Sequence, residues 1–505
     1  MKILFLYPNS GSQVGFNYGV AHLAGVLKNK GHKISFWQLC EELAPLPAQD
    51  QFCRRLRTEA PDLLAFSVVT NQWAYARRLA EWARHVFPGP LVCGGIHTLF
   101  NTDQILDTGL FDYVFRGECE DAFAEFVTRL EQNQNVDGLP NLAFRRAGRT
   151  RINPVRPLPD LQTLPPKDYS IMDFQTLIDA KKGWVGLMAS RGCPFACTYC
   201  FNHQMVDVYR RDLGCSFRQL HYIRHFPVEQ VIGEIRFLLE SYRRINMFIF
   251  DDDLFTFDKT WVRQFAAAYR RLTSLPFVVN AHVGFFDAEL AALLAIAGCR
   301  VVKFGVESGS PELRRRILHR HMTNERIIEA VTQVNTASMH SSVFIIIGFP
   351  HETPDHLMET IRLLALARPG RFRWTYFFPY PGTRAHQMSI EGGFVNQAKM
   401  DRLVNFTDES CLDFGPQQNL LLKKIGRIMP WFVNAYSDLP VAPEYRRRVD
   451  NLLALEDHQW EKIAPTLHAE DKLLSSRFAA RGLTHYAIKY NPFMGVISDY
   501  FLNEK

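Results

Sequence analysis

The first 137 residues alternate short apolar runs with amphipathic segments. The apolar runs predict strands, and segments with apolar positions every three or four residues predict helices. We expect strands at residues 2–7, 33–38, 62–69, 91–93 and 111–115, and helices at 18–28 and 72–86. Strands and helices in this alternation specify a doubly wound parallel sheet, a Rossmann-like fold of the α/β class. A nucleotide is one possible ligand, although no G-x-G-x-x-G sequence follows the first strand.

A second alternating series begins near residue 180, after a proline-rich stretch at 138–179 that predicts a linker. Strands are expected at residues 184–189, 246–250, 277–281, 301–306, 342–347 and 374–378, with helices such as 228–241 and 287–297 between them. Six β/α units predict a partial barrel over residues 180–385, open on one side. Residues 386–505 show helical spacing at 425–436, 449–455 and 478–490 and predict a helical C-terminal domain.

Composition narrows the class of protein. A chain of 505 residues exceeds a single core, and 47% hydrophobic with 22% charged residues is typical of a soluble globular protein. The net charge of +6 is modest. Basic clusters such as Arg314 to Arg316 lie on helix-like polar segments, where a solvated face is expected, and no nucleic-acid reader motif accompanies them, so we expect no nucleic-acid partner. No apolar run is long enough to span a membrane, and the N-terminal run is too short for a signal peptide, so a cytoplasmic location is expected. The 39 phenylalanines leave room for a hydrophobic small-molecule substrate, although core packing accounts for most of them.

Three cysteines lie within eight residues, directly after the expected strand at 184–189. Cys193, Cys197 and Cys200 are separated by three and then two residues, so one short loop can point all three thiols at an inorganic centre. Thiolates hold iron–sulfur clusters, and a four-iron cluster with three protein ligands leaves one iron open to bind a small molecule. A structural zinc site with His203 as the fourth ligand is the alternative, but such sites usually draw their ligands in pairs from separated segments.

The loop at 191–202, with an aromatic residue before its last cysteine, resembles the signature of the radical S-adenosylmethionine (SAM) superfamily. The resemblance implies that the three cysteines bind a [4Fe-4S] cluster whose unique iron chelates SAM. One electron, delivered to the cluster by a donor such as flavodoxin or ferredoxin, then cleaves SAM to a 5′-deoxyadenosyl radical. The SAM-binding residues that the resemblance implies, near the loop and at strand ends, are Tyr199, Phe201, Glu307, Ser308, Gly348 and Phe378.

The N-terminal domain, residues 1–137, resembles the cobalamin-binding domain that precedes the barrel in one large radical SAM subfamily. Residues 17–24, 94–97 and 116–120 carry this resemblance. Small residues at strand ends let a flat ligand approach the backbone, and ligands of such sheets bind at that edge. The expected cobalamin-binding residues are Ser67, Thr70, Gly94, Gly95, Gly117 and Glu118.

The loop after the first strand departs from that subfamily. Many cobalamin-binding domains carry an Asp-x-His-x-x-Gly sequence there, whose histidine ligates cobalt, but residues 8–15 contain neither Asp nor His. Cobalamin therefore binds without a protein ligand to cobalt, or the domain is only a scaffold. The subfamily contains class B methyltransferases and relatives of the magnesium-protoporphyrin monomethyl ester oxidative cyclase.

We expect cobalamin-dependent methylation of an unactivated carbon. The first alternative is a radical cyclase, or an enzyme that forms or rearranges carbon–carbon bonds, which uses no methylcobalamin. The second alternative is a zinc-stabilised binding protein without enzymatic activity.

Overall fold

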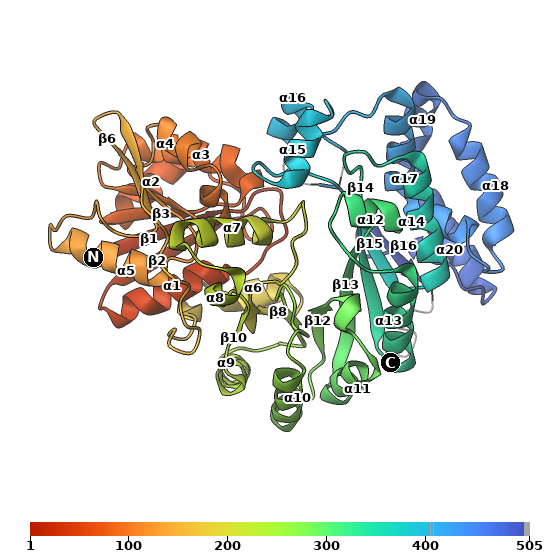
Figure 1. Ribbon diagram of the computed structural model, residues 1–505, viewed down its shortest axis with the longest axis horizontal. Coiled ribbons are helices and arrows are strands. Elements are labelled where there is room, and N and C mark those ends of the chain that lie inside the picture. The colour runs from red at the N-terminus through yellow and green to blue at the C-terminus, as the bar shows by residue number, and fades with distance from the viewer. Residues whose placement is uncertain (404–405, 408, 499–505) are drawn as a thin grey trace. The chain divides into compact units, whose positions relative to one another are not determined.

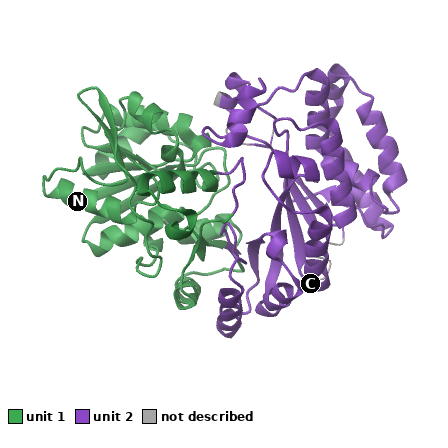
Figure 2. Ribbon diagram, viewed as in Figure 1, with its two compact units in different colours: residues 1–194, 201–248 green, residues 195–200, 249–505 purple. Residues whose placement is uncertain are grey.

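The computed structural model describes residues 1–403, 406–407 and 409–498, and it has the expected α/β architecture (Figure 1). The chain forms two compact units (Figure 2). Residues 1–194 and 201–248 make up the first unit, and residues 195–200 and 249–505 make up the second. The boundary crosses the cysteine loop twice, so residues 195–200 pack with the second unit. The four domains expected from the sequence remain a prediction.

The first unit is built on a seven-stranded sheet in the order β2-β1-β3-β4-β5-β6-β7. The first five strands in that order are parallel, which confirms the doubly wound sheet. They are β1 (Lys2–Pro8), β2 (Lys33–Leu39), β3 (Leu63–Ser67), β4 (Leu91–Gly94) and β5 (Tyr113–Phe115). The helices of this unit are α1 (Tyr18–Asn29), α2 (Gln49–Glu59), α3 (Trp73–Arg84), α4 (Thr102–Asp107), α5 (Glu120–Glu131), α6 (Phe174–Ala180), α7 (Phe201–Leu213), α8 (Phe217–Leu220) and α9 (Val228–Ser241).

Alternate residues of the central strands fill one face of this sheet. Leu4 and Leu6 of β1 and Phe66 of β3 pack in one buried cluster with Phe52 of α2 and Leu79 of α3. The period of two along each strand places these side chains on the same face, where the amphipathic helices cover them. The pattern of apolar residues thus selects both the strands and the helices that shield them.

The stretch expected to be a linker contains regular structure that the sequence did not predict. Strands β6 (Leu142–Arg146) and β7 (Arg149–Ile152) form an antiparallel hairpin that extends the first sheet beyond β5. Only Leu142, Ala143 and Phe144 of β6 are buried, a run too short to reveal a period of two. Backbone pairing with the edge strand β5 forms β6, rather than any local pattern.

The second unit contains a mixed sheet in the order β16-β17-β15-β14-β13-β12-β11. The strands β12 to β15 are parallel and correspond to the expected β/α units of the partial barrel. The strands of this sheet are β11 (Met247–Phe250), β12 (Phe277–Ala281), β13 (Cys299–Glu307), β14 (His340–Ile347), β15 (Arg371–Tyr376), β16 (Tyr486–Ile488) and β17 (Met494–Ile497). Its first helices are α10 (Lys259–Leu272), α11 (Ala288–Ala297), α12 (Pro311–Arg316), α13 (Asn324–Thr336) and α14 (Pro354–Ala367). The strand before the cysteine loop, β8 (Trp184–Leu187), belongs to the first unit.

The C-terminal region is mainly helical, as expected, but its end is not. The helices are α15 (Arg384–Glu391), α16 (Gln397–Arg402), α17 (Pro416–Ala435), α18 (Ala442–Leu453), α19 (Asp457–Ile463) and α20 (Leu467–Ala480). The helical spacing read at 478–490 was wrong beyond Ala480, because β16 begins at Tyr486 and pairs with β17. The side chain of Asn434 accepts from the backbone N–H of Tyr486 at 2.8 Å and donates to its carbonyl at 2.7 Å. This pair of long-range hydrogen bonds holds the segment extended.

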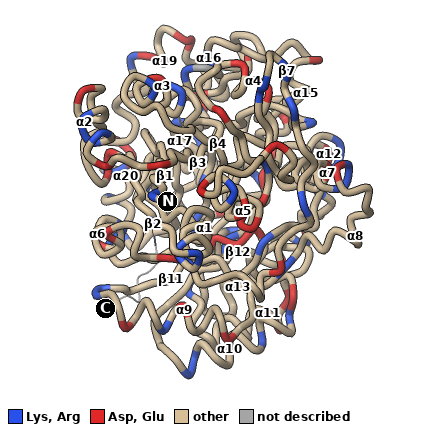
Figure 3. Tube along the Cα trace, turned by 90° about the vertical axis from the view of Figure 1, so that its left-hand side faces the viewer, with Lys and Arg blue, Asp and Glu red and all other residues tan. Residues whose placement is uncertain are grey.

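Charged residues of both signs are interspersed along the chain (Figure 3). Helices α10 and α11 are an example, where Arg263 pairs with Glu289 and Lys259 with Asp287. Within the described residues, no helix is both long and apolar enough to cross a membrane.

Candidate active site

Thr198 anchors the middle of the cysteine loop to the second unit. Its hydroxyl donates to the carbonyl of Ile317 at 2.6 Å, and its backbone N–H donates to Leu318 at 3.3 Å. Its carbonyl accepts from the N–H of Ala385 at 3.0 Å. Because Thr198 lies between Cys197 and Cys200, these three hydrogen bonds fix the positions of both cysteines within the second unit.

Arg320 lies against the cysteine loop and was not identified from the sequence. Its Nη1 atom is 3.4 Å from the Sγ atom of Cys197 and 3.4 Å from the hydroxyl of Tyr199, and its Nη2 donates to the carbonyl of Gly305. Burial lowers the pKa of Arg320, but the neighbouring Tyr199, Glu307 and Cys197 raise it above its usual value. The guanidinium therefore remains a buried cation beside a thiol that can become a thiolate.

Glu307 occupies the end of β13, next to Arg320. Its φ of 69° lies in the left-handed region, and the pairing of β13 with β14 shifts register between Gly305 and Glu307. A side chain at position 305 would meet the carboxylate, since an added Cβ would lie 2.5 Å from Oε1 of Glu307. Burial raises the pKa of Glu307, while Arg320 and a hydrogen bond with Tyr199 oppose the rise. Strained backbone and a buried acid together are typical of functional positions.

The remaining residues expected at the SAM site are held by neighbours in the loops that follow the strands. The hydroxyl of Ser308 lies 3.3 Å from that of Thr360, and the backbone N–H of Gly348, with a φ of 81°, donates to Glu352. Phe378 packs against Tyr380 and Phe406, with ring centroids at 5.0 and 4.9 Å. Phe201 begins α7 in the first unit and stacks on Phe100 at 5.5 Å. The structure thus brings Tyr199 and Glu307 together around Arg320, and the SAM-binding role of all six residues stays a prediction.

One expectation about the basic clusters needs correction. Arg314, which we placed on a solvated face, is fully buried and donates to the carbonyl of Ser308 at 2.6 Å and to Asn324 at 2.6 Å. Its guanidinium fixes the turn after β13, a role that a local charge pattern cannot reveal.

At the carboxyl edge of the first sheet, Ser67 and Gly94 are paired across β3 and β4. The hydroxyl of Thr70 lies 3.4 Å from Nδ1 of His97, whose buried Nε2 atom has no hydrogen-bond partner among the residues that the structure describes. Gly95 has a φ of 95°, and an added Cβ would lie 2.5 Å from the carbonyl oxygen of Val68. Small residues and an unsatisfied imidazole nitrogen at this edge fit a polar, flat ligand such as a corrin.

The loop that lacks the cobalt-ligating sequence is closed by Gln72. Gln72 is buried, and its side chain binds the backbone and hydroxyl of Ser10 and the hydroxyl of Ser12. The polar groups of Ser10 and Ser12 in this loop therefore bind Gln72, and the loop has no histidine that could bind a ligand.

Gly117 and Glu118 contact the segments that flank the cysteine loop. An added Cβ at Gly117 would lie 2.4 Å from the hydroxyl of Tyr209, and the Glu118 carboxylate binds Arg191 and Arg224. Burial raises the pKa of Glu118, but the two arginines hold it below its ordinary value. The cobalamin-binding role of both residues stays a prediction.

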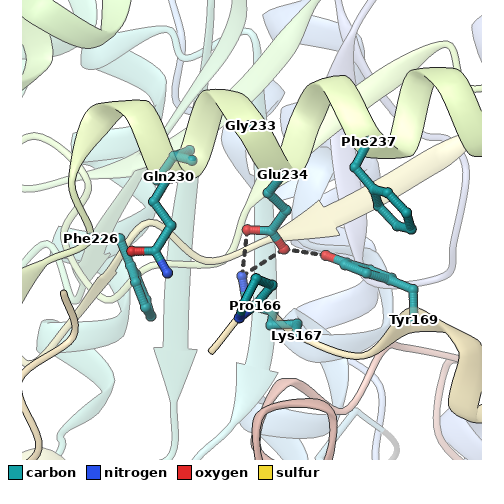
Figure 4. A pocket seen from close by; sticks show the side chains of 9 residues that line it. Pro166, Lys167, Tyr169, Phe226, Gln230, Gly233, Glu234 and Phe237 are labelled. Atoms are coloured by element: carbon teal, nitrogen blue, oxygen red, sulfur yellow. Dashed lines mark hydrogen bonds and ion pairs between the residues drawn. The ribbon is translucent and has the colours of Figure 1, made fainter. Parts of the chain in front are cut away.

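A cavity of about 340 Å³ lies in the first unit, beside α9 (Figure 4). Lys167 donates to both carboxylate oxygens of Glu234 at 2.7 Å, and the hydroxyl of Tyr169 donates to the same group. The rest of the lining is mainly apolar and includes Phe226 and Phe237. Because Lys167 and Glu234 pair with each other, the described residues that line the cavity offer no unpaired charge to a ligand.

Lys167→Met should lower the free energy of unfolding by about 3 kcal/mol, the lower end of the cost of breaking a buried ion pair, because the Glu234 carboxylate (15% exposed) loses its cation but keeps the hydrogen bond from Tyr169. Denaturant unfolding of the purified protein measures the loss. The double variant Lys167→Met with Glu234→Leu removes both charges and should lose much less. Equal losses in the single and double variants would show that packing, rather than the ion pair, stabilises this region.

No group of three or more His, Cys, Asp or Glu side chains in the described part of the chain is arranged to hold a single metal ion. His203, the fourth ligand of the zinc alternative, instead lies 3.5 Å from Asp207 on the same helix. A four-iron cluster makes a different demand, since each thiolate binds a separate iron. Three cysteine thiols in one loop, with an arginine beside one of them, fit that donor set.

Comparison with known families gives two matches. The B12 binding domain matches residues 10–127, and the radical SAM superfamily matches residues 187–364. The two matched regions together contain the strand-end residues of the first sheet and all three cysteines of the loop.

Relatives and solved structures cover most of the chain. An uncharacterized methyltransferase of Pyrococcus horikoshii is 26% identical over 406 residues, 78% of this chain and 84% of the relative. The anaerobic magnesium-protoporphyrin IX monomethyl ester cyclase of Rubrivivax gelatinosus is 25% identical over 400 residues, 75% of this chain and 68% of the relative. The radical SAM methyltransferase TsrM of Kitasatospora setae, solved with cobalamin and a [4Fe-4S] cluster bound, superposes with a TM-score of 0.61. That match is 17% identical and covers 77% of this chain and 75% of the other, which shows a shared fold.

Proposed function

We propose that this chain, which carries a B12-binding domain followed by a radical SAM domain, methylates an unactivated carbon of a small-molecule substrate. The two matches make it a cobalamin-dependent radical SAM enzyme. The observation that supports methylation is the methyltransferase relative of Pyrococcus horikoshii, which aligns over 84% of its own length.

In this proposal Cys193, Cys197 and Cys200 hold the [4Fe-4S] cluster. When bound, the cluster supplies the electron that cleaves SAM, and methylcobalamin supplies the methyl group. Thr198 keeps the loop in place, so that two of the three thiolates need little ordering when iron binds. Arg320 donates to the Cys197 sulfur and compensates part of the thiolate charge in a buried environment.

Glu307 provides the acceptor for SAM in the same proposal. A buried carboxylate at a strand end can accept hydrogen bonds from a ribose hydroxyl or an amino group. Arg320 and Tyr199 contact it from within the second unit and set its orientation before a ligand arrives.

Cobalamin would lie at the carboxyl edge of the first sheet, over Ser67, Thr70 and Gly94. The Gln72-bound loop contains no Asp or His, so it offers no imidazole to cobalt from the position that many related domains use. His97, with its unsatisfied Nε2, is the polar group nearest in sequence to Gly94 and Gly95.

A cyclase is the second candidate function. The specific observation that favours it is the relative in Rubrivivax gelatinosus, an anaerobic magnesium-protoporphyrin IX monomethyl ester cyclase, at nearly the same identity as the methyltransferase. The same cysteines and SAM-binding residues would serve this reaction.

Purification without oxygen, followed by metal, sulfide and corrinoid analysis, tests the proposal. We expect about four irons and four sulfides per chain after reconstitution, and one retained cobalamin. Release of 5′-deoxyadenosine from SAM should require a one-electron donor such as reduced flavodoxin or ferredoxin. Absence of corrinoid with an intact cluster would favour the cyclase, and tightly bound zinc without iron would overturn both functions.

A further inference from the structure

The segment Arg116–Glu120, which we call the 116–120 segment, links the first sheet to both ends of the cysteine loop. It follows β5 and begins α5. The carboxylate of Glu118 accepts from Nη1 of Arg191 at 2.6 Å, and Glu120 lies 2.7 Å from the same Nη1 atom. Arg191 is two residues before Cys193, so both carboxylates act on the entrance of the loop.

The exit of the loop is attached to the same segment. Tyr209 of α7, the helix that follows the last cysteine, accepts a hydrogen bond from the backbone N–H of Glu118 at 2.7 Å. Gly117 leaves the space that the Tyr209 hydroxyl occupies. Farther along α7, Asp212 lies 3.4 Å from Nη1 of Arg116. All of these residues belong to the first unit.

The two glutamates of the 116–120 segment neutralise the positive charges of Arg191 and Arg224. Arg191 and Arg224 are directly opposite in the antiparallel pair β9 (Ser190–Arg191) and β10 (Arg224–His225). Like charges in that arrangement repel, and the repulsion is stronger when the pair is buried. The two oxygens of Glu118 bind one arginine each, so this carboxylate holds the small sheet together.

We propose that Glu118 and Glu120, which lie in the B12-binding domain, are positioning residues. They fix the side chain of Arg191 and thereby hold Cys193 in the position in which it binds the cluster. This inference rests on the proposed role of Cys193 as a cluster ligand. The 116–120 segment would then couple the domain that holds cobalamin to the loop that holds iron.

The main test variant is Glu118→Gln combined with Arg224→Met. Glu118→Gln alone leaves Arg224, whose side chain is 13% exposed, without its carboxylate and should lower the melting temperature. The double variant restores the charge balance, so its melting temperature should return toward that of the native chain. In the double variant Arg191 still lacks one of its two carboxylates. A change in Cys193 that persists in this variant therefore comes from lost positioning of Arg191 and not from lost stability of the fold.

Two measurements report on the cysteine loop itself: the rate of Cys193 alkylation and the amount of iron bound. In the iron-free full-length chain, alkylation of Cys193 by iodoacetamide, measured by mass spectrometry, should be faster by about tenfold, because one charge-assisted hydrogen bond no longer holds the segment closed. After anaerobic reconstitution, the double variant should bind less iron than the native chain. The matched control is Glu125→Gln on α5, the helix that follows Glu118, where the carboxylate also binds two arginines, Arg129 and Arg156, away from the loop. It should change neither readout.

The proposal would be overturned if the folded double variant showed the same rate of Cys193 alkylation and the same iron content as the native chain. If that variant does not fold, Glu120→Gln replaces it, since Glu118 then still binds both arginines. Unchanged Cys193 reactivity in Glu120→Gln would also overturn it. The alkylation assay needs no iron, so it remains decisive even if the native chain binds no cluster, an outcome that would refute only the proposed function.

Discussion

Cys197→Ala should abolish the release of 5′-deoxyadenosine from SAM. Cys197 is buried at 5% exposure and contacts Arg320, so its replacement removes a proposed cluster ligand and leaves the guanidinium without that sulfur. Loss of a ligand should exceed the factor of about 10–100 that replacing an outer partner typically costs. Anaerobic iron analysis and chromatography of the SAM products measure the effect.

Cys53→Ala is the matched control for that variant. Cys53 is also buried, but it packs in the hydrophobic cluster of the first sheet. The control should keep about four irons per chain and native cleavage of SAM. Persistent 5′-deoxyadenosine release in Cys197→Ala would refute the ligand assignment.

Arg320→Met should reduce 5′-deoxyadenosine formation by about 10–100-fold, the usual cost of losing a hydrogen-bond partner of a metal ligand. The variant removes a buried cation beside Cys197, and the midpoint potential of the cluster should become more negative because the reduced state loses a compensating charge. It also removes the cation that opposes the raised pKa of Glu307, so this carboxyl should be protonated more readily. A redox titration followed by electron paramagnetic resonance, together with the product assay, measures both effects.

Arg326→Met provides the comparison for Arg320. Arg326 binds the carbonyl of Phe286 at 2.7 Å and pairs with Glu329 on the surface of α13. It should leave the midpoint potential unchanged. Arg320→Lys keeps the charge but not the planar fork, so an intermediate effect is expected. A native potential in Arg320→Met would show that the arginine has no influence on the cluster.

Most elements were predictable because their signal is local. Strands such as β1, β3 and β11 are short, mainly apolar runs, and α9 matches the expected 228–241 segment at both ends. The failures occur where a distant partner decides the structure. The hairpin β6–β7 forms on the edge of β5, and β16 forms because Asn434 and β17 bind its backbone. Neither segment has an alternation of apolar and polar residues that is long enough to predict a strand.

The candidate site divides in the same way. The spacing of Cys193, Cys197 and Cys200 is a property of one short segment, and the B12-binding and radical SAM matches confirm the family resemblance that it suggested. The partners of those residues lie far away in the sequence. Arg320 reaches Cys197 across 123 residues, and Glu118 reaches Arg191 across 73.

By itself, the sequence determined the alternating elements, the cysteine loop and the class of chemistry, since each depends on residues that are neighbours along the chain. Only the tertiary structure decided which charges surround the loop. A buried charge is stable only beside its counterion, and folding selects that counterion from any part of the chain. Arg320 and Glu118 therefore acquire their roles from the positions to which strand pairing brings them.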